Sequence, residues 1–451
     1  METFLLKEIA LATGGKIHSK FESVLIDNVS TDSRDIKKNA LFVPIKGENF
    51  DGHDFIFDCI EKGASGCLTE KELPENIPCI LVKDTKKALR DLAKFYISKF
   101  DIPKCAVTGS VGKTTTKDMI ASVLSEKFNT LKTEGNFNNE IGLPRTVFGI
   151  DKDTEAAVLE MGMNHFGEIH NLSEIVRPSI GVITNIGVSH IENLGSREGI
   201  LKAKLEILDF MKDDGVVFLN GDDPYLRKAE TGRKTVYFGI ESTCDVYAKN
   251  IRHDGLSGTF AEIHKGDICF EVKVPVPGSH MVLNALAASA VGFELGLSPE
   301  EIKRGIEGFK KSKMRMDIIA GNGINIINDV YNANPVSVKA AIDVLSAAEG
   351  RRVAILGDML ELGEFSEAMH KDVGEYTGKS GIDVLIAIGK DAKYIFEGAE
   401  KSLLKECFYF ETQEDFFAEG IQKIFKGDTV LVKASRGMSL EKTVYKLQEV
   451  D

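Results

Sequence analysis

Apolar residues along the chain follow two alternating patterns that predict its fold. Short and almost continuous apolar runs, typical of strands buried on both faces, are separated by stretches with the three- to four-residue spacing of a helix. The clearest runs lie at 105–107, 156–159, 180–183, 324–327, 353–356, 384–387 and 429–432. The alternation predicts an α/β fold with parallel sheets covered by helices on both faces.

The alternation restarts near residue 324, so these runs are assigned to two separate sheets. Before residue 99 the pattern indicates a small α/β domain, and the alternating Val272, Val274 and Val276 indicate an antiparallel addition to the first large sheet. A chain of 451 residues is expected to form roughly three domains. We predict them at 1–98, 99–312 and 313–451, the last being a Rossmann-like doubly wound sheet.

Composition narrows the class of protein. With 43% hydrophobic and 28% charged residues, an acidic N-terminus and no long apolar run, the chain is predicted to be cytoplasmic and not inserted in a membrane. A net charge of −13 argues against nucleic-acid binding. The seven cysteines are scattered and never spaced C-x-x-C, so they indicate neither a disulfide framework nor a zinc motif. In the absence of an obvious coiled coil we expect a monomer.

A glycine-rich stretch, Thr108–Thr115, lies between an apolar run and an amphipathic helical pattern. It predicts a phosphate loop in which backbone N–H groups and Lys113 bind phosphate oxygens and Thr114 holds Mg²⁺. Val107 occupies the first glycine position of the general pattern, and the alternative is an ordinary strand-to-helix turn. We favour ATP binding, with contacts from Gly109, Ser110, Val111, Gly112, Lys113, Thr114 and Thr115.

The Thr-Gly-Ser-Val-Gly-Lys-Thr-Thr form of this loop resembles that of the Mur ligases and their folylpolyglutamate synthetase relatives, and further matches extend over nearly the whole chain. The resemblance implies a UDP-sugar-binding domain at 1–98, a central P-loop ATPase domain at 99–312 and a domain at 313–451 that binds the incoming amine. It also implies an ATP-dependent amide-bond ligase.

Three more residues of the expected central domain complete the predicted catalytic and Mg²⁺-binding set with Lys113 and Thr114. Glu160 ends an apolar run, where an acidic metal ligand is expected beside a phosphate loop. His190 alone would be an ordinary surface or core residue, but the resemblance implies a metal ligand. Lys204 matches a family A-K-x-E-I stretch, which implies a carbamate near a second metal ion. The alternative for Lys204 is a solvated cation.

Adenine recognition is expected from Asn284, because Gly278–Ala285 resembles the family's H-N-x-x-N-A stretch, although Met281 replaces its first asparagine. In the alternative interpretation, Asn284 is only a structural residue at the start or on the surface of a helix of small residues and contacts no nucleotide. Arg315 and Asp329 match family residues that contact the phosphate and ribose of ATP. A guanidinium fork and a carboxylate suit those two partners.

The resemblance also implies residues that bind the larger substrate. Asn138 and Asn139 lie in a stretch like the family's substrate-binding loop and would contact a UDP-muramoyl peptide. Short motifs around Ser33, Arg34 and Lys46 resemble segments of the tripeptide-forming and dipeptide-adding ligases, which implies positions near the UDP or the peptide. Within the second of these motifs, Asp51-Gly52 is equally well interpreted as a turn.

Three motifs of the C-terminal domain favour the dipeptide-adding members of the family. These are Tyr331–Pro335, Leu356–Gly363 and Lys433–Met438. We expect Asn332, Asp358, Ser435 and Arg436 near a D-alanyl-D-alanine substrate; the alternative is that they are strand-end turn residues. For Asn334, which precedes Pro335, capping of the following helix is favoured.

The resulting hypothesis is a peptidoglycan-precursor ligase that uses ATP and Mg²⁺ to join D-alanyl-D-alanine to UDP-N-acetylmuramoyl-tripeptide through an acyl phosphate. The alternatives are a tripeptide-forming Mur ligase, a folylpolyglutamate synthetase, or a nucleotide-switched binding protein that does not ligate. The motifs leave open whether the tripeptide ends in lysine or diaminopimelate.

Overall fold

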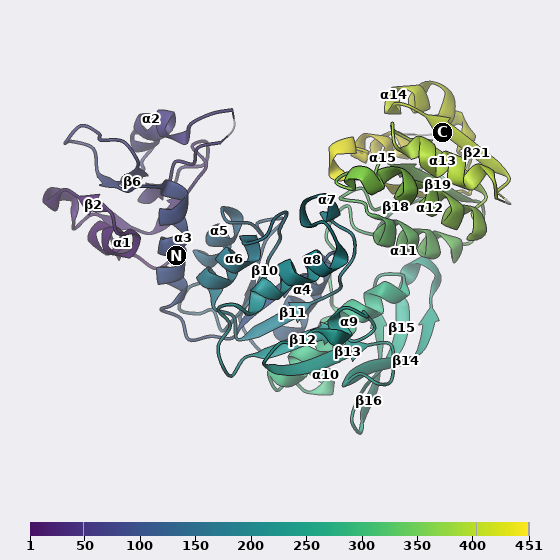
Figure 1. Cartoon of the computed structure of the whole chain (residues 1–451), viewed down its shortest axis with the longest axis horizontal. Helices are drawn as coiled ribbons and strands as arrows, with labels where there is room; N and C mark the ends of the chain where they lie inside the picture. Colours follow the sequence, from purple (N-terminus) through teal and green to yellow (C-terminus); the bar gives the residue numbers. More distant parts are fainter. Residues whose placement is uncertain (48, 403, 450–451) are drawn as a thin grey trace. The chain divides into compact units, whose positions relative to one another are not determined.

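The computed structural model describes residues 1–47, 49–402 and 404–449 (Figure 1). These residues form two compact units, each built from several stretches of the chain. Unit 1 consists of 1–108, 128–182 and 205–216, and unit 2 consists of 109–127, 183–204 and the chain from 217 onwards. The predicted domain boundaries at 98 and 312 remain a prediction.

The first part of unit 1 is a small α/β layer. Its five-stranded sheet has the order β2-β7-β6-β5-β4, and β1 pairs with β3 beside it. Helix α3 packs against α1 and β6, and Asp84 caps its start by accepting the Lys87 N–H at 2.9 Å. The bounds are β1 Phe4–Leu5, α1 Leu6–Thr13, β2 Lys16–Ile17, β3 Leu25–Ile26, β4 Asn28–Ser30, β5 Ala40–Phe42, α2 Ile56–Glu61, β6 Gly66–Thr69, β7 Cys79–Leu81 and α3 Thr85–Ile97.

The second part of unit 1 contains the three apolar runs predicted as buried strands between residues 105 and 183. All three are fully buried strands, and four strands follow the order β9-β10-β8-β11. In the parallel pair of β10 and β8, Glu160 lies opposite Val107, the residue directly before the glycine-rich loop. The bounds are β8 Lys104–Thr108, β9 Thr130–Lys132, α5 Gly142–Val147, β10 Ala156–Glu160, α6 Glu168–Val176 and β11 Ile180–Ile183.

The first part of unit 2 combines the helix after the glycine-rich loop with five further strands in the order β12-β13-β14-β15-β16. Helix α9 packs on β13, β14 and β15 and against α4. The predicted antiparallel addition is confirmed, because β14, β15 and β16 pair antiparallel. The bounds are α4 Lys113–Leu124, α7 Ile191–Leu194, α8 Arg197–Leu205, β12 Val216–Asn220, β13 Lys234–Gly239, β14 Val246–His253, β15 Thr259–Lys265, β16 Ile268–Val274, α9 Ser279–Glu294 and α10 Pro299–Glu307.

The C-terminal part of unit 2, coloured green to yellow in Figure 1, is the predicted doubly wound sheet. Its strand order is β17-β18-β22-β19-β20-β21. The four predicted strands are its parallel centre, and the antiparallel edge strand β17 was not predicted. Helices α11, α12 and α13 pack in sequence, while α15 packs against β18. The bounds are β17 Asp317–Ala320, β18 Asn325–Asn328, α11 Pro335–Ser346, β19 Arg352–Gly357, α12 Ser366–Lys379, β20 Val384–Ile388, α13 Ala392–Glu400, β21 Glu406–Phe410, α14 Gln413–Asp415, β22 Thr429–Lys433 and α15 Glu441–Gln448.

Two expectations from composition concern the whole chain. All seven cysteines are free thiols, and four of them are buried. Within the described residues, none of the helices combines the length and apolar character that a membrane crossing requires.

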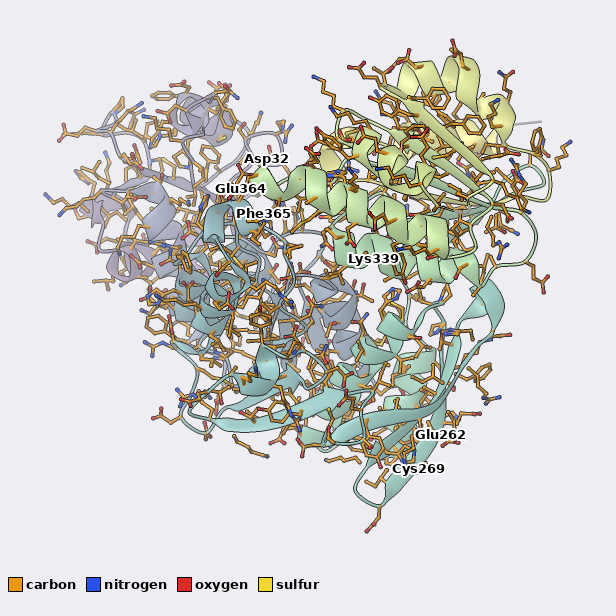
Figure 2. All side chains as sticks on the ribbon, turned by 45° about the vertical axis from the view of Figure 1, so that its right-hand side comes forward. Asp32, Glu262, Cys269, Lys339, Glu364 and Phe365 are labelled. Carbon is orange, nitrogen blue, oxygen red and sulfur yellow. The ribbon has the colours of Figure 1, made fainter. Side chains whose placement is uncertain are left out.

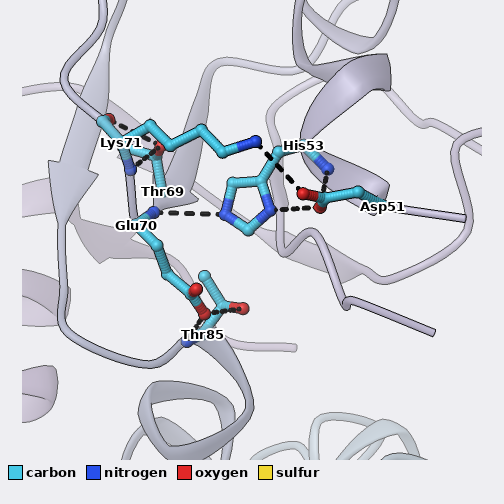
Figure 3. A network of polar contacts seen from close by, with 6 residues as sticks. All are labelled: Asp51, His53, Thr69, Glu70, Lys71 and Thr85. Atoms are coloured by element: carbon cyan, nitrogen blue, oxygen red, sulfur yellow. Dashed lines mark hydrogen bonds and ion pairs between the residues drawn. The ribbon is translucent and has the colours of Figure 1, made fainter. Parts of the chain in front are cut away.

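The buried His53 makes hydrogen bonds that hold the Asp51-Gly52 segment of unit 1, for which a turn was the alternative prediction (Figure 3). Asp51 accepts the backbone N–H of His53 at 3.0 Å and lies 2.6 Å from its ring Nδ1. The other ring nitrogen accepts the Glu70 N–H at 3.1 Å, so a ring protonated at Nδ1 satisfies both contacts. These hydrogen bonds, the backbone one first, lower the pKa of Asp51. A Cβ on Gly52 would lie 2.7 Å from the backbone nitrogen of Ile45, so the turn requires glycine.

We expect His53→Ala to destabilise this segment by about 1–3 kcal/mol, because the Glu70 N–H and one Asp51 oxygen lose their buried partner. Hydrogen exchange of the peptides that cover β6 measures the local opening free energy. The matched control is Lys71→Ala, which removes a 61% exposed partner of the same Asp51 and should cost less than about 1 kcal/mol. Equal effects of the two substitutions would contradict the structural role of His53.

Candidate active site

The glycine-rich loop joins β8 to α4 with two glycines in conformations that other residues rarely adopt. Gly109 has φ 152° and Gly112 has φ 81°. A Cβ on Gly109 would lie only 1.8 Å from Thr184 Oγ1, so a side chain at this position is excluded. The predicted strand, loop and helix are therefore confirmed. The first turn of α4 leaves backbone N–H groups without intrahelical acceptors at the end of this loop, as an anion site requires.

Asn185 fixes the shape of the loop, a role that the sequence analysis missed. Its Oδ1 accepts the Val111 N–H at 2.9 Å, and its Nδ2 donates to the Val111 carbonyl at 3.0 Å. The Thr184 hydroxyl donates to the same carbonyl at 2.6 Å. Both residues lie just after β11, at the carboxyl end of a predicted strand, and this place was the available signal.

Two lysines of unit 2 form the candidate catalytic pair. Lys113 Nζ donates to the Gly109 carbonyl at 2.8 Å, so its ammonium lies along the loop. Lys204, on α8, is only 1% exposed. Burial, followed by the charge of Lys113, lowers the pKa of Lys204 well below its ordinary value. Lys204 is therefore not the solvated cation of the alternative interpretation, and its buried setting favours the neutral form of the amine.

His190 adopts a left-handed backbone conformation, with φ 62°, at the start of α7. Its ring Nδ1 lies 2.8 Å from Glu361 Oε2. The contact with His190 is also the main reason why the pKa of Glu361 is lowered. Glu361 had no predicted role although it lies within the Leu356–Gly363 motif. The carboxylate of Glu361 thus lies beside the predicted metal ligand His190, and this contact could not be predicted from the sequence.

Asn284 connects the two helices α4 and α9 at the base of the loop. Its Oδ1 accepts the Thr116 hydroxyl at 2.9 Å, and its Nδ2 lies 3.5 Å from Met281 Sδ. The oxygen would also be 3.2 Å from a Cβ on Gly112, so the side chain lies directly against the loop. The helix-supporting role that was the alternative for Asn284 is therefore present, and the adenine contact remains a prediction.

Arg315 and Asp329 are each held by neighbours in the C-terminal part of unit 2. The guanidinium of Arg315 lies 3.9 Å from the ring centroid of Tyr331. Asp329 Oδ2 accepts from the buried Lys433 Nζ at 2.5 Å, and the same ammonium donates to the Asn332 carbonyl at 2.9 Å. Lys433 begins the Lys433–Met438 motif, and the sequence predicted no role for it. It orients both the predicted ribose ligand Asp329 and the predicted substrate residue Asn332.

Asp358 and Ser435 are held by the folded sheet at its strand ends. Asp358 Oδ1 accepts the N–H groups of Asp391 and Ala392 at 3.0 and 2.7 Å, at the start of α13. Burial raises the pKa of this carboxyl. Ser435 accepts the Leu360 N–H at 2.9 Å. Both residues have the structural role of the alternative interpretation, and their contact with a dipeptide remains a prediction.

Arg436 and Asn334, two further residues of the C-terminal motifs, have different surroundings from the buried Asp358 and Ser435. The side chain of Arg436 is 55% exposed and lies 3.3 Å from Glu441, so it can reorient toward a ligand. Asn334 caps α11 by accepting the Ser337 N–H at 2.9 Å, with Pro335 as the first helical residue. The capping role favoured for Asn334 is confirmed.

In unit 1, Glu160 has the environment of a metal ligand. One carboxylate oxygen accepts the Asn138 amide N–H at 2.8 Å, and the backbone N–H of Glu160 donates to Thr133 at 3.0 Å. The other oxygen, Oε2, is buried and has no hydrogen-bond partner among the described residues. A buried carboxylate oxygen without a donor suits a cation. Asn139 accepts the N–H groups of Ile141 and Gly142 at the start of α5 instead of standing free.

The three predicted residues of the amino-terminal domain are accessible. Arg34 is bound bidentately to Asp32 at 2.9 and 2.8 Å, yet its side chain is 87% exposed. This pairing with Arg34 lowers the pKa of Asp32. The Ser33 carbonyl accepts from Lys62 at 2.9 Å, and Lys46 forms an isolated β-bridge with Asp51. A ligand phosphate would have to compete with Asp32 for Arg34.

Three family models match the chain in consecutive order. The model described as "Mur ligase family, catalytic domain" matches 25–97, "Mur ligase middle domain" matches 107–292, and "Mur ligase, glutamate ligase domain" matches 314–436.

Proteins and solved structures similar over their full length carry more specific names. A Bacillus subtilis protein named UDP-N-acetylmuramoyl-tripeptide--D-alanyl-D-alanine ligase is 42% identical over 98% of both chains. The crystal structure of MurF from Acinetobacter baumannii has a TM-score of 0.93 at 33% identity, over 100% of both chains. That of the MurF ligase from Thermotoga maritima in complex with ADP has a TM-score of 0.84 at 31% identity, over 94% of this chain and 97% of that one.

Proposed function

The chain belongs to the Mur ligase family, and on this basis we propose that it joins D-alanyl-D-alanine to UDP-N-acetylmuramoyl-tripeptide at the expense of ATP. The observation that carries the proposal is the 42% identity, over 98% of both chains, to a relative named for this reaction. The Tyr331–Pro335 motif supports the dipeptide as the incoming amine. Neither this relative nor this motif supports the two alternatives, a tripeptide-forming ligase and a folylpolyglutamate synthetase.

The glycine-rich loop would bind the triphosphate of ATP. The N–H groups at the start of α4 and the ammonium of Lys113 face the same turn, and Asn185 holds the backbone of the loop in shape. Asn284 at the base of the loop, together with Arg315 and Asp329, would bind the nucleoside end and the phosphates. The ADP complex of the Thermotoga maritima relative supports a nucleotide in this family's site.

We assign Mg²⁺ binding to Thr114, Glu160, His190 and a carbamate on Lys204. Glu160 Oε2, which has no hydrogen-bond partner among the described residues, and the carbamate oxygens that Lys204 would supply suit this role, since Mg²⁺ prefers oxygen ligands. The lowered pKa of the buried Lys204 favours the neutral amine from which a carbamate forms. When bound, Mg²⁺ neutralises charge on the transferring phosphoryl oxygens.

The reaction proceeds in two displacements. A terminal carboxylate oxygen of the tripeptide attacks the γ-phosphorus of ATP, the bond to the bridging oxygen breaks, and ADP leaves. The dipeptide amine then attacks the acyl carbon, loses a proton to solvent, and displaces phosphate. In both steps Lys113 stabilises negative charge on the phosphoryl group, as expected for positioning and electrostatic catalysis.

We assign the binding of the UDP-linked substrate and of the dipeptide to residues that are accessible or that lie near strand ends. Ser33, Arg34 and Lys46 would bind the UDP end, and Asn138 and Asn139 the muramoyl peptide. Asp358, Ser435, Arg436 and Asn332 would bind the dipeptide.

The matched ranges 25–97, 107–292 and 314–436 support domains at 1–98, 99–312 and 313–451. Because its substrates are ATP and a UDP-linked precursor, we expect the enzyme to act in the cytoplasm, and we expect a monomer.

Release of ADP with each substrate supplied alone and with both together tests the proposed function. We expect ADP formation to require the UDP-muramoyl tripeptide, and sustained turnover to require D-alanyl-D-alanine as well. ADP formation that ignores both compounds would instead support a nucleotide-switched protein without ligase activity. Glutamate-dependent turnover with a folate would favour the synthetase alternative.

We expect Asn284→Ala to raise the KM for ATP by roughly tenfold, equivalent to about 1.4 kcal/mol, with little change in the KM for the dipeptide. The reason is that the amide faces Gly112 at the base of the phosphate loop. Thr116→Val, which removes only the hydroxyl that Asn284 accepts, is the matched control for the structural role. If both KM values rise equally in Asn284→Ala, the residue supports the helices and does not bind adenine.

A further inference from the structure

The β-hairpin of β15 and β16 brings three residues with metal-binding side chains to one face. The antiparallel register places His264 directly opposite Cys269. Glu262 lies two residues before His264 on the same strand, and therefore on the same face of the hairpin. Figure 2 shows Glu262 and Cys269 on this outlying hairpin of unit 2. The reaction assigned above uses none of these residues.

The distances between their ligand atoms are those of atoms around a shared ion. His264 Nε2 lies 3.6 Å from Glu262 Oε2 and 3.7 Å from Cys269 Sγ, and all three atoms lie within 4.8 Å of one another. The contact between His264 and Glu262 is longer than an ordinary hydrogen bond between nitrogen and oxygen. Tetrahedral zinc with bonds of about 2.0–2.3 Å separates its ligand atoms by roughly 3.3–3.6 Å. The two distances from His264 Nε2 are within a few tenths of an ångström of these values, and Glu262 Oε2 and Cys269 Sγ lie no more than 4.8 Å apart.

A histidine–glutamate ion pair alone does not explain this geometry. Both contacts are made by the same ring nitrogen of His264, Nε2, and a single ring nitrogen makes one hydrogen bond. Yet a carboxylate oxygen and a sulfur approach this nitrogen at nearly the same distance, as ligands of one cation would.

Neighbouring side chains hold two of the three ligands in place. The ring of His264 stacks on Tyr247 of β14, with centroids 4.9 Å apart and an interplanar angle of 3°. The amide of Asn250 donates to Glu262 Oε2 at 2.8 Å. Partners that orient a ligand in this way are a general feature of metal sites.

We propose that Glu262, His264 and Cys269 form a binding site for a divalent transition metal ion of the Zn²⁺ type, with water in the fourth position. Sulfur, imidazole nitrogen and one carboxylate oxygen select such an ion over Mg²⁺, which prefers oxygen ligands. On binding, the Cys269 thiol gives its proton to solvent and a metal–sulfur bond forms. The ion would link the two strands of the hairpin.

The site has no C-x-x-C spacing, which is why the sequence indicated no zinc motif. Its ligands come from two strands and meet only through the register of the hairpin.

Cobalt absorption of the full chain tests the proposal directly. We expect Co²⁺ to produce a thiolate-to-cobalt charge-transfer band that Cys269→Ser abolishes. Cobalt bound at the nucleotide site would give no such band, because that site offers oxygen and nitrogen ligands. Cys407→Ser is the matched control and should keep the band, since burial raises the pKa of the Cys407 thiol to about 12. The absence of the band, or its persistence in Cys269→Ser, would overturn the proposal.

Competition with a chromophoric chelator then measures Zn²⁺ affinity. We expect His264→Ala to weaken binding by more than about 100-fold and Asn250→Ala by roughly tenfold, the latter being the usual effect of losing an orienting partner. ADP release with Mg²⁺ should be unchanged in both variants, which confirms that they fold. Zn²⁺ affinity that is equal in wild type and His264→Ala would contradict the site.

Discussion

Replacing Lys113 by alanine is expected to abolish measurable ligation while leaving the fold intact. The ammonium lies along the glycine-rich loop, 2.8 Å from the Gly109 carbonyl, and in the complex it would neutralise phosphoryl charge that the free chain does not carry. Loss of one such group costs on the order of 10²–10³-fold in kcat, and we expect at least this loss of kcat in Lys113→Ala.

The measurement for Lys113→Ala is ADP release with all substrates saturating. Lys127→Ala is the matched control, since this lysine lies just beyond α4 and donates to the exposed carbonyl of Gly296. We expect the control to retain near-normal activity. Retention of most activity in Lys113→Ala would refute the phosphate-loop assignment.

Replacing Lys204 by alanine is expected to lower kcat by at least on the order of 10²-fold, and a short-chain carboxylate should restore part of it. Lys204 is 1% exposed, and burial together with the Lys113 charge lowers its pKa. An amine reacts with CO₂ only in its neutral form, so this environment favours a carbamate. A carbamate would replace a cation that repels Mg²⁺ by an anionic oxygen pair.

Chemical rescue separates a ligand role from a packing role of Lys204. Added formate or acetate supplies oxygens in place of those of the carbamate but does not restore the packing that the Lys204 side chain provides. Lys202→Ala, an exposed position on the same helix α8, should neither lose activity nor respond to the added acids. Near-normal activity of Lys204→Ala at saturating Mg²⁺ would show that no carbamate is needed.

The buried parallel strands could be predicted because their sequences are apolar on both faces. The runs that became β8, β10, β19 and β20 are examples. The strand β21, Glu406–Phe410, escaped prediction because it lies at the edge of its sheet and is only partly buried. Edge strands mix polar and apolar residues, and periodicity alone does not separate them from loops.

The loop residues of the candidate site could be predicted, but their supporting partners could not. Lys113 and the glycines carry a local pattern. Asn185, Glu361 and Lys433 act through residues 74, 171 and 104 positions away, and such contacts leave no spacing in the sequence. The burial of Lys204 was likewise invisible, because a lysine on a helix is ordinarily solvated.

The central claim is that one chain forms an acyl phosphate from ATP and the tripeptide and then couples the dipeptide. Incubation with tripeptide labelled with oxygen-18 in its terminal carboxylate tests it most directly. We predict that the UDP-muramoyl pentapeptide forms in equal amount to ADP and that the released phosphate carries the label, because the attacking carboxylate oxygen stays on phosphorus when the amine displaces it. Unlabelled phosphate, or ADP without pentapeptide, would contradict the account.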